Sequence, residues 1–335
     1  MLCFVPRNSS QGPNNLAEHY RGSGGSGACP IAGISIQYEF DLKTGVFLDL
    51  TITESVRNDQ TDAKETSENV FENDLVIRDL GYFSIPVFSK ISKEKAYFLS
   101  RLNSNVLVYE KKGEVLDFKK LYDEMTKNGI EKCEKRVTIG EDNLSVRLLI
   151  GVVPEHVYEE RIRRKQKEEK KKGHTMKEKT KLLCHFNLFI TNAEEEKLPM
   201  DKIMPLYWFR WQVELMFKNW KSVFSIHKLQ KMKKTRYITM LYIRLIFIVI
   251  NLQIVNRVQS AISKQRCQTG ILSYKKTLQT LKNMFFEILR VLRSKQEKAV
   301  KCLEKIYKIL SKNHWREKRK NRKNFVENIC QFSCL

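Results

Sequence analysis

Four residues in the second half of the chain have side chains that could act together: Tyr207, Arg210, Glu214 and Lys221. Their spacings of three, four and seven residues place them on one face of an α-helix. These spacings place one carboxylate beside Arg, Lys and Tyr on an otherwise apolar, aromatic helix, an arrangement that a reactive site could use. An amphipathic helix with an ordinary ion pair between Arg210 and Glu214 would show the same pattern. The spacing alone leaves both interpretations open.

The composition is that of a folded, strongly basic protein. The chain has 335 residues, of which 42% are hydrophobic, and its formal net charge is +23. This length predicts about two domains, or one large domain with an insertion. The excess of positive charge favours a polyanionic partner, either nucleic acid or an anionic membrane surface.

The cysteine and hydropathy patterns indicate where in the cell the protein is found and whether it crosses a membrane. The eight cysteines are scattered without a CxxC pair, which favours reduced thiols inside a cell, and no zinc-ligand spacing is present. Residues 1–15 show no secretory signal. The one membrane candidate, 237–255, carries Arg244 near its middle, so we expect a buried core helix and no membrane.

The pattern of apolar residues predicts an α/β fold. Period-two alternation on either side of the segment 41–45 predicts a β-hairpin over residues 34–52. A polar helix and several short strands follow, and after residue 198 the pattern is helical. We expect the hairpin to share one mixed sheet with the strands at 75–79 and 182–191. The predicted helices are 62–73, 200–223, 234–260, 271–295 and 297–311, and the further strands are 75–77, 97–102, 105–110, 136–139, 144–153 and 181–191.

Two runs of positive charge interrupt this pattern. Residues 161–181 hold eleven Lys or Arg against three Glu, and residues 312–323 hold seven against one. Such a run is either a solvated helix or loop tip, or a surface that grips a nucleic acid backbone. In a chain this basic, both interpretations stay open for the first run.

Taken with its surroundings, the four-residue set resembles a known family. Tyr, two residues, Arg, three residues, Glu, six residues, Lys is similar to the signature of bacterial insertion-sequence transposases of the fourth family, which are DDE enzymes. The block Leu75–Tyr82, where an Asp ends a strand before Gly-Tyr, resembles their second conserved block. The segment Arg21-Gly-Ser-Gly-Gly, followed by the predicted hairpin, resembles their first hairpin.

The resemblance implies a ribonuclease-H-like mixed sheet and a two-metal phosphoryl transfer at the ends of an insertion sequence. By resemblance, Asp79 is the second acid and Glu214 the third, and both bind Mg²⁺ or Mn²⁺. Arg210 and Lys221 would contact phosphates next to the scissile bond. Tyr207 would contact the backbone of the transposon end.

The first acid of the family departs from the pattern. In the corresponding stretch, Asn8 stands where Asp is expected, and a neutral carboxamide cannot supply the charge of a shared metal ligand. Asp41 or Asp49 could substitute as a ligand. The chain begins seven residues before Asn8, so the resemblance predicts a truncated or decayed copy, or a misassigned start.

The sequence therefore predicts four segments. They are residues 1–110 and 182–230 as two parts of the catalytic domain, 111–181 as a mainly β insertion that ends in a basic run, and 231–335 as a helical region with a basic tail. Expected partners are DNA, contacted also by Arg163, Arg164 and Lys165, and a second copy in a synaptic homodimer. The expected location is the bacterial cytoplasm, at the nucleoid. The alternative is a non-enzymatic, basic nucleic-acid-binding protein.

Overall fold

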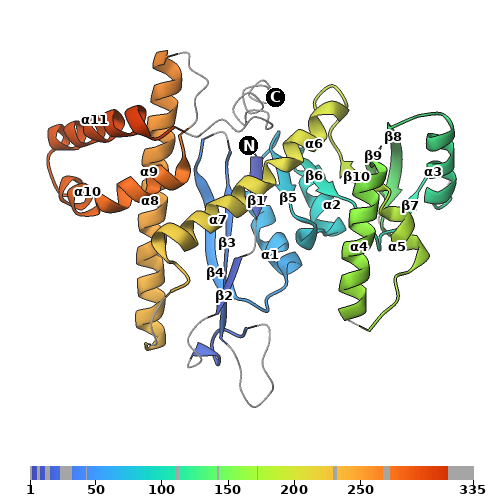
Figure 1. Ribbon diagram of the computed structural model, residues 1–335, viewed down its shortest axis with the longest axis horizontal. Coiled ribbons are helices and arrows are strands. Elements are labelled where there is room, and N and C mark those ends of the chain that lie inside the picture. Colours follow the sequence, from blue (N-terminus) through green and yellow to red (C-terminus); the bar gives the residue numbers. More distant parts are fainter. Residues whose placement is uncertain are drawn as a thin grey trace. The chain divides into compact units, whose positions relative to one another are not determined.

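The computed structural model describes residues 2–5, 8–11, 16–22, 32–42, 44–110, 113–141, 143–171, 173–228, 232–266 and 272–315 (Figure 1). The chain forms two compact units, one made of residues 1–5 and 58–210 and the other of residues 6–57 and 211–335. The expected segment boundaries at residues 110, 181 and 230 fall inside these units. Most of the glycine-rich segment 22–27 and most of the basic tail 312–323 lie outside the described residues.

The first unit is built on a seven-stranded mixed sheet in the order β1-β5-β6-β10-β9-β8-β7. Strands β1, β5 and β6 are parallel, and the other pairs are antiparallel. The strands are β1 Leu2–Val5, β5 Leu75–Arg78, β6 Tyr97–Arg101, β7 Val108–Tyr109, β8 Lys132–Ile139, β9 Leu144–Val152 and β10 Phe186–Thr191. The helices are α1 Asp59–Thr66, η2 Ser67–Asn69, η3 Leu80–Tyr82, α2 Ile85–Lys93, α3 Phe118–Lys127, α4 Glu155–Lys171, α5 Glu178–Leu183 and α6 Met200–Trp208.

The core of this unit explains why the parallel strands are apolar. Helix α2 joins β5 to β6, and it buries Val87, Phe88 and Ile91 on one face. The ring of Phe88 stacks on Phe98 of β6 with centroids 4.4 Å apart. Helix α2 thus covers one face of the parallel strands, and the burial of Val76, Ile77 and Arg78 matches the short apolar run at Leu75–Ile77.

The second unit combines a small sheet with helices. Its sheet has the antiparallel order β2-β3-β4, with β2 Asn8–Gln11, β3 Gly33–Phe40 and β4 Phe47–Glu54. The helices are α7 Arg210–Phe224, which starts at the last residue of the first unit, α8 Lys234–Arg266, α9 Tyr274–Asn283, α10 Phe285–Leu292 and α11 Gln296–Asn313. Tyr38 of β3 packs against Phe217 and Trp220 of α7, with ring centroids 4.9 and 5.3 Å apart.

A mixed α/β fold with a helical C-terminal part is confirmed, but the hairpin was expected in the same sheet as residues 75–79. That prediction was wrong: β3 and β4 hydrogen-bond with β2, whereas β5 and β10 belong to the seven-stranded sheet. Alternation along the chain specifies which face of a strand is buried, but it does not specify which distant strand becomes its partner.

The middle of the chain also differs from expectation. Residues 132–152 supply β8 and β9, which extend the sheet beyond β10 rather than forming a separate β insertion. The expected strand 181–191 begins only at Phe186, because residues 178–183 form α5. A short apolar run is equally compatible with a helix and a strand, which explains this error.

Helix α8 is long and apolar enough to span a membrane by length and composition, and 33% of the window concerned is buried. Leu241, Leu245 and Ile248 lie on its buried side. The Arg244 guanidinium near its middle donates to the carbonyl oxygens of Ser225 and Lys228, at 2.7 and 3.1 Å. These contacts are those of a helix that packs within the second unit.

Candidate functional site

Asp79 lies where the central parallel strand of the first unit ends. It follows β5, which pairs with β1 on one side and β6 on the other. Its Oδ1 accepts a hydrogen bond from the backbone N–H of Leu80 at 2.8 Å, so Asp79 caps the turn η3. Its side chain is 47% exposed, whereas the three residues before it, Val76, Ile77 and Arg78, are buried. A carboxylate at this edge can reach a ligand in solution.

The residues on either side of Asp79 fix its position. Arg78 is buried, and its guanidinium donates to the carbonyl oxygen of Ala63 at 2.9 Å and to the hydroxyl of Thr66 at 3.0 Å. This ties the end of β5 to helix α1. A Cβ at Gly81 would lie 2.8 Å from Oδ2 of Asp59, so this site excludes a side chain unless Asp59 moves. Sequence reasoning missed both supports, although an Arg inside an apolar strand was a signal for Arg78.

Arg210 pairs with Asp79. Its Nη1 lies 3.4 Å from Oδ2 of Asp79, and the two side chains are 20% and 47% exposed. The helix expected over 200–223 is interrupted at Phe209, so Tyr207 ends α6 while Arg210 begins α7. Pro205 lies inside α6, where it removes a helical hydrogen bond and weakens a continuous helix. The single helix expected over 200–223 is therefore two helices, with Tyr207 on α6 and the other three signature residues on α7.

Tyr207 completes this group from α6. Its ring meets Phe189 of β10 edge-on with centroids 5.1 Å apart, and the Arg210 guanidinium carbon lies 5.8 Å from the Tyr207 ring centroid. Burial, followed by the charge of Asp79, raises the pKa of Tyr207 to about 12, although Arg210 and Arg101 oppose the rise. The phenol therefore stays protonated at neutral pH and can donate a hydrogen bond.

The three side chains form what we call the Asp79 cluster: Asp79, Tyr207 and Arg210. It offers one hard carboxylate, one guanidinium and one phenolic donor at the edge of a sheet. Guanidinium and phenol donors suit phosphate oxygens, while a carboxylate suits Mg²⁺. Among the residues that the structure describes, no group of three or more metal-ligating side chains is present.

Glu214 and Lys221 are described with the second unit. They lie seven residues apart on α7, and both are partly buried. The neighbouring face of α7 carries Phe217 and Trp220, which pack against β3. The sequence signature is thus divided, with Tyr207 and Arg210 in the first unit and Glu214 and Lys221 in the second. Asn8 begins β2, and its side chain lies outside what the structure describes.

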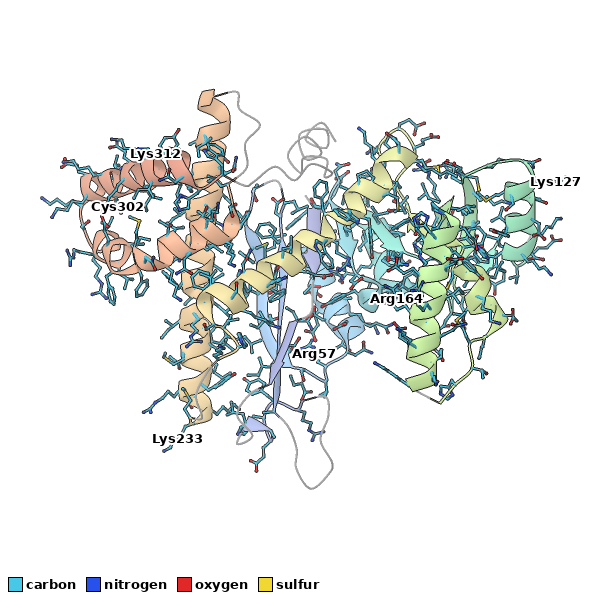
Figure 2. All side chains as sticks on the ribbon, viewed as in Figure 1. Arg57, Lys127, Arg164, Lys233, Cys302 and Lys312 are labelled. Atoms are coloured by element: carbon cyan, nitrogen blue, oxygen red, sulfur yellow. The ribbon has the colours of Figure 1, made fainter. Side chains whose placement is uncertain are left out.

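The first basic run is largely a helix. Helix α4 has no buried residue, and Arg163 and Arg164 are exposed on it. Figure 2 labels Arg164 on this helix. Lys165 forms an ion pair with Glu168 at 3.0 Å. Arg161 instead points inward: its guanidinium donates to the carbonyl oxygens of Cys184 and Phe186 and to Oδ1 of Asn187. One helix therefore holds both an anchor and an exposed basic surface.

A second anchor of α4 was not predicted. The His185 ring stacks on Tyr158 of α4 with centroids 3.7 Å apart, and it packs against Tyr122 of α3 at 4.3 Å. Figure 1 shows α3, α4 and α5 at this end of the first unit. Burial lowers the pKa of His185, although the charge of Glu155 opposes this. Burial therefore favours the neutral form of the ring, which acts as a packing element.

Comparison with known proteins identifies the family of the chain. A family model described as "Transposase DDE domain" matches residues 9–252. The transposase of insertion sequence element IS231E from Bacillus thuringiensis subsp. finitimus is 30% identical over 341 residues, and the match covers 95% of this chain and 69% of that protein.

Two further matches are another insertion-sequence transposase and a solved structure. The transposase of IS1151 from Clostridium perfringens is 30% identical over 259 residues, which cover 72% of this chain and 54% of that protein. Among solved structures, the piggyBac transposase synaptic complex with hairpin DNA aligns with a TM-score of 0.41 at 13% identity, covering 96% of this chain and 59% of that one. On the strength of the family model and the insertion-sequence relatives, the chain belongs to the DDE transposases.

Proposed function

We propose that the Asp79 cluster is part of the centre at which this transposase cuts and joins DNA at the ends of an insertion sequence. The observation that carries this assignment is the ion pair between Asp79 and Arg210, at the carboxyl end of a parallel strand. Ligands of open α/β sheets bind at this edge. An exposed carboxylate beside a guanidinium is suited to a phosphodiester whose negative charge one group neutralises while the other binds a cation.

The donor set fits a divalent metal ion. Asp79 supplies hard carboxylate oxygens on an exposed edge, and Glu214 on α7 is the second carboxylate of the proposed set. Carboxylates of this kind would hold Mg²⁺ or Mn²⁺. When bound, such ions activate the attacking oxygen and stabilise the leaving one.

The remaining residues of the signature act on the DNA backbone in this proposal. Arg210 neutralises a phosphate oxygen next to the scissile bond, and the protonated Tyr207 hydroxyl donates to a neighbouring one. Lys221, seven residues beyond Glu214 on α7, contributes a further cation. Because Tyr207 does not ionise near neutral pH, its role is binding rather than proton transfer.

The fold supports a ribonuclease-H-like core. An antiparallel set (β2, β3 and β4) is followed along the chain by α1 and then by the parallel pair β5 and β6, joined through α2. We take three basic residues of α4, the exposed Arg163 and Arg164 and the partly buried Lys165, to bind DNA outside the centre. A homodimer that holds two transposon ends, in the cytoplasm at the nucleoid, completes the proposal.

Asn8 is the reason why we expect this copy to cleave DNA only weakly. Its carboxamide stands where the family pattern has its first acid, and it cannot supply the negative charge of a bridging ligand. We therefore expect DNA binding with little strand cleavage. Asn8→Asp should increase metal-dependent nicking of a duplex that carries the terminal repeats of the element.

The test compares four proteins on that duplex, with Mg²⁺ or Mn²⁺ and with chelator. These are the unmodified chain, Asn8→Asp, Asn8→Asp with Glu214→Gln, and Asn8→Asp with Lys93→Ala. Lys93 is an exposed cation at the end of α2 and serves as the control. Nicking that appears with Asn8→Asp, disappears with Glu214→Gln and survives Lys93→Ala supports the proposal. Efficient nicking that survives Glu214→Gln would overturn the site assignment, and DNA binding without nicking in any variant would favour a non-enzymatic DNA-binding protein.

A further inference from the structure

Arg101 is the last residue of β6 and lies level with Asp79. In the parallel pair β5–β6, Ile77 is the partner of Leu99. Asp79 and Arg101 each follow two residues later, at the same carboxyl edge of the sheet. Because side chains alternate along a strand, Arg101 is on the same face as Leu99.

That face is the one on which Tyr207 lies. In the antiparallel pair β10–β6, Arg101 is the partner of Phe189, so these two side chains share a face. The Phe189 ring in turn packs against Tyr207 at 5.1 Å. Helix α6 also contacts β6 directly. Register and packing thus place Arg101 beside the Asp79 cluster, on a strand that the signature motifs do not include.

The contacts of Arg101 differ from those of the structural arginines of this unit. The guanidinium groups of Arg78, Arg147 and Arg161 each donate two or three hydrogen bonds to protein oxygens. Arg101 is exposed, and its guanidinium makes no hydrogen bond or ion pair with a residue that the structure describes. The fold does not use this side chain to hold itself together.

The charge of Arg101 affects groups on both sides of it, the Asp79 cluster and helix α4. Its charge lowers the pKa of Tyr207, against the larger effects of burial and Asp79. It also lowers the pKa of Arg161, second to burial, so it lies near the anchored part of α4 as well. An uncompensated guanidinium close to other cations favours an anion at that point.

We infer that Arg101 is a DNA-binding residue that holds one backbone phosphate between the Asp79 cluster and helix α4. The inference rests on the proposed function, because it assigns a further contact to the same DNA. A guanidinium offers two parallel donors to a phosphate, so Arg101 would fix the position of the strand that leaves the centre and passes towards Arg163 and Arg164. This is a positioning role along the DNA, separate from metal binding.

The test measures binding rather than cleavage. The probe is a short duplex that ends in the outermost sequence of the insertion element, together with a series of the same duplex in which single phosphates are replaced by neutral methylphosphonates. The proteins are the unmodified full chain, Arg101→Ala, Arg101→Lys, Arg210→Ala and Lys93→Ala. Lys93 precedes β6 and so marks the opposite end of that strand from Arg101.

We expect Arg101→Ala to weaken binding about tenfold, as for loss of a hydrogen-bonded charge, and to lower the salt slope by about 0.9. One methylphosphonate that weakens binding by the unmodified chain should have no further effect on Arg101→Ala, while all other positions stay sensitive. Arg101→Lys should keep the salt slope and recover only part of the affinity, because lysine keeps the charge but loses the two-pronged geometry. Lys93→Ala should behave as the unmodified chain.

An Arg101→Ala protein with unchanged affinity, or with the same sensitivity at every phosphate, would overturn the inference. In that case Arg210→Ala could still become insensitive to a methylphosphonate at one phosphate, the one that Arg210 contacts. The proposed function would then stand, and only the role of Arg101 would fail. If the unmodified chain bound the duplex no more tightly than it bound an uncharged polymer, both the inference and the proposed function would fail. Thermal unfolding of each variant excludes misfolding as the cause of weaker binding.

Discussion

Two arginine–carboxylate pairs of the first unit show what a site at the edge of the sheet requires. Arg147 of β9 is 3% exposed; it donates to Oε2 of Glu134 at 2.6 Å and to the carbonyl oxygens of Ala193 and Leu198 at 2.8 and 3.1 Å. Arg210 and Asp79 are 20% and 47% exposed, and their closest atoms are 3.4 Å apart. In the first, closed pair the guanidinium is enclosed by the protein, although the Glu134 side chain is 35% exposed; in the second, open pair the contact is longer and both side chains reach solvent.

The difference separates the charges that hold the fold from those that can serve a ligand. A buried guanidinium is stable only when carbonyls and carboxylates replace its lost water, and Arg147 has three such partners. An exposed pair gains little stability, because water screens both charges. Asp79 can therefore release Arg210 and bind a metal ion, while Arg210 binds a phosphate. This exchange should have little effect on the stability of the fold.

The largest expected effect concerns Asp79. In a chain that carries Asn8→Asp, Asp79→Asn should reduce metal-dependent nicking by about a hundredfold or more, because it removes charge stabilisation at the reacting phosphate. The free energy of unfolding should change by less than about 1 kcal/mol, because the side chain is half exposed. Nicking rates and urea unfolding of the same preparation measure both quantities. Undiminished nicking would show that Asp79 is not part of the centre.

The closed pair should behave in the opposite way. Arg147→Ala should lower the free energy of unfolding by about 3 kcal/mol, because it leaves Glu134 and two carbonyl oxygens without their donor. Arg210→Ala, the matched control, should cost less than about 1 kcal/mol. Equal losses in urea unfolding for the two variants would contradict the distinction between closed and open pairs.

Helix α4 repeats the same contrast within one element. Arg161 is anchored to the backbone after α5, whereas Arg163 and Arg164 are exposed. Replacing Arg163, Arg164 and Lys165 by alanine should lower the slope of log affinity against log salt by about 0.9 for each phosphate that the variant no longer neutralises, with little change in stability. Arg161→Ala should chiefly lower stability. Fluorescence anisotropy over a range of salt concentrations, paired with thermal unfolding, separates the two. An unchanged salt slope in the triple variant would remove α4 from the DNA-binding surface.

The sequence was most informative where spacing reflects a backbone period. Alternation at Ile34, Ile36 and Tyr38 predicted the hairpin, and the buried rings of Phe217 and Trp220 cover the same face. The strand that ends at Asp79 and most C-terminal helices also lie close to their predicted positions. These features depend on neighbours along the chain.

Features that depend on distant neighbours were not predictable. Whether a strand joins one ladder or another is decided by pairing across the sheet, so the separation of β2-β3-β4 from β5 was missed. The interruption at Phe209 was missed, although Pro205 four residues earlier was a signal in the sequence for a weakened helix. Arg101 could not be predicted as a DNA-binding residue, because only the pairing of β6 with β5 and β10 brings it level with Asp79.

The smallest expected effect concerns the stack of His185 between Tyr122 and Tyr158, which belongs to the closed side of α4. Burial lowers the pKa of His185 in the folded protein, whereas Glu155 opposes the shift. A group with a lowered folded pKa binds its proton more readily when unfolded. Its contribution to stability is therefore complete above the unfolded pKa of about 6.5 and is lost as the pH falls through the folded pKa.

His185→Phe keeps an aromatic ring between the two tyrosines but cannot take up a proton. The unmodified chain should therefore lose slightly more stability than His185→Phe when the pH falls from about 7 to about 5, while the two should show parallel curves above pH 7. Urea unfolding over this pH range measures the difference, and His174→Phe, at an exposed histidine after α4, is the matched control. If both histidine variants followed the unmodified chain at every pH, protonation of His185 would not be coupled to folding. The stack would then act on α4 through its packing alone, as Arg161 does through its hydrogen bonds.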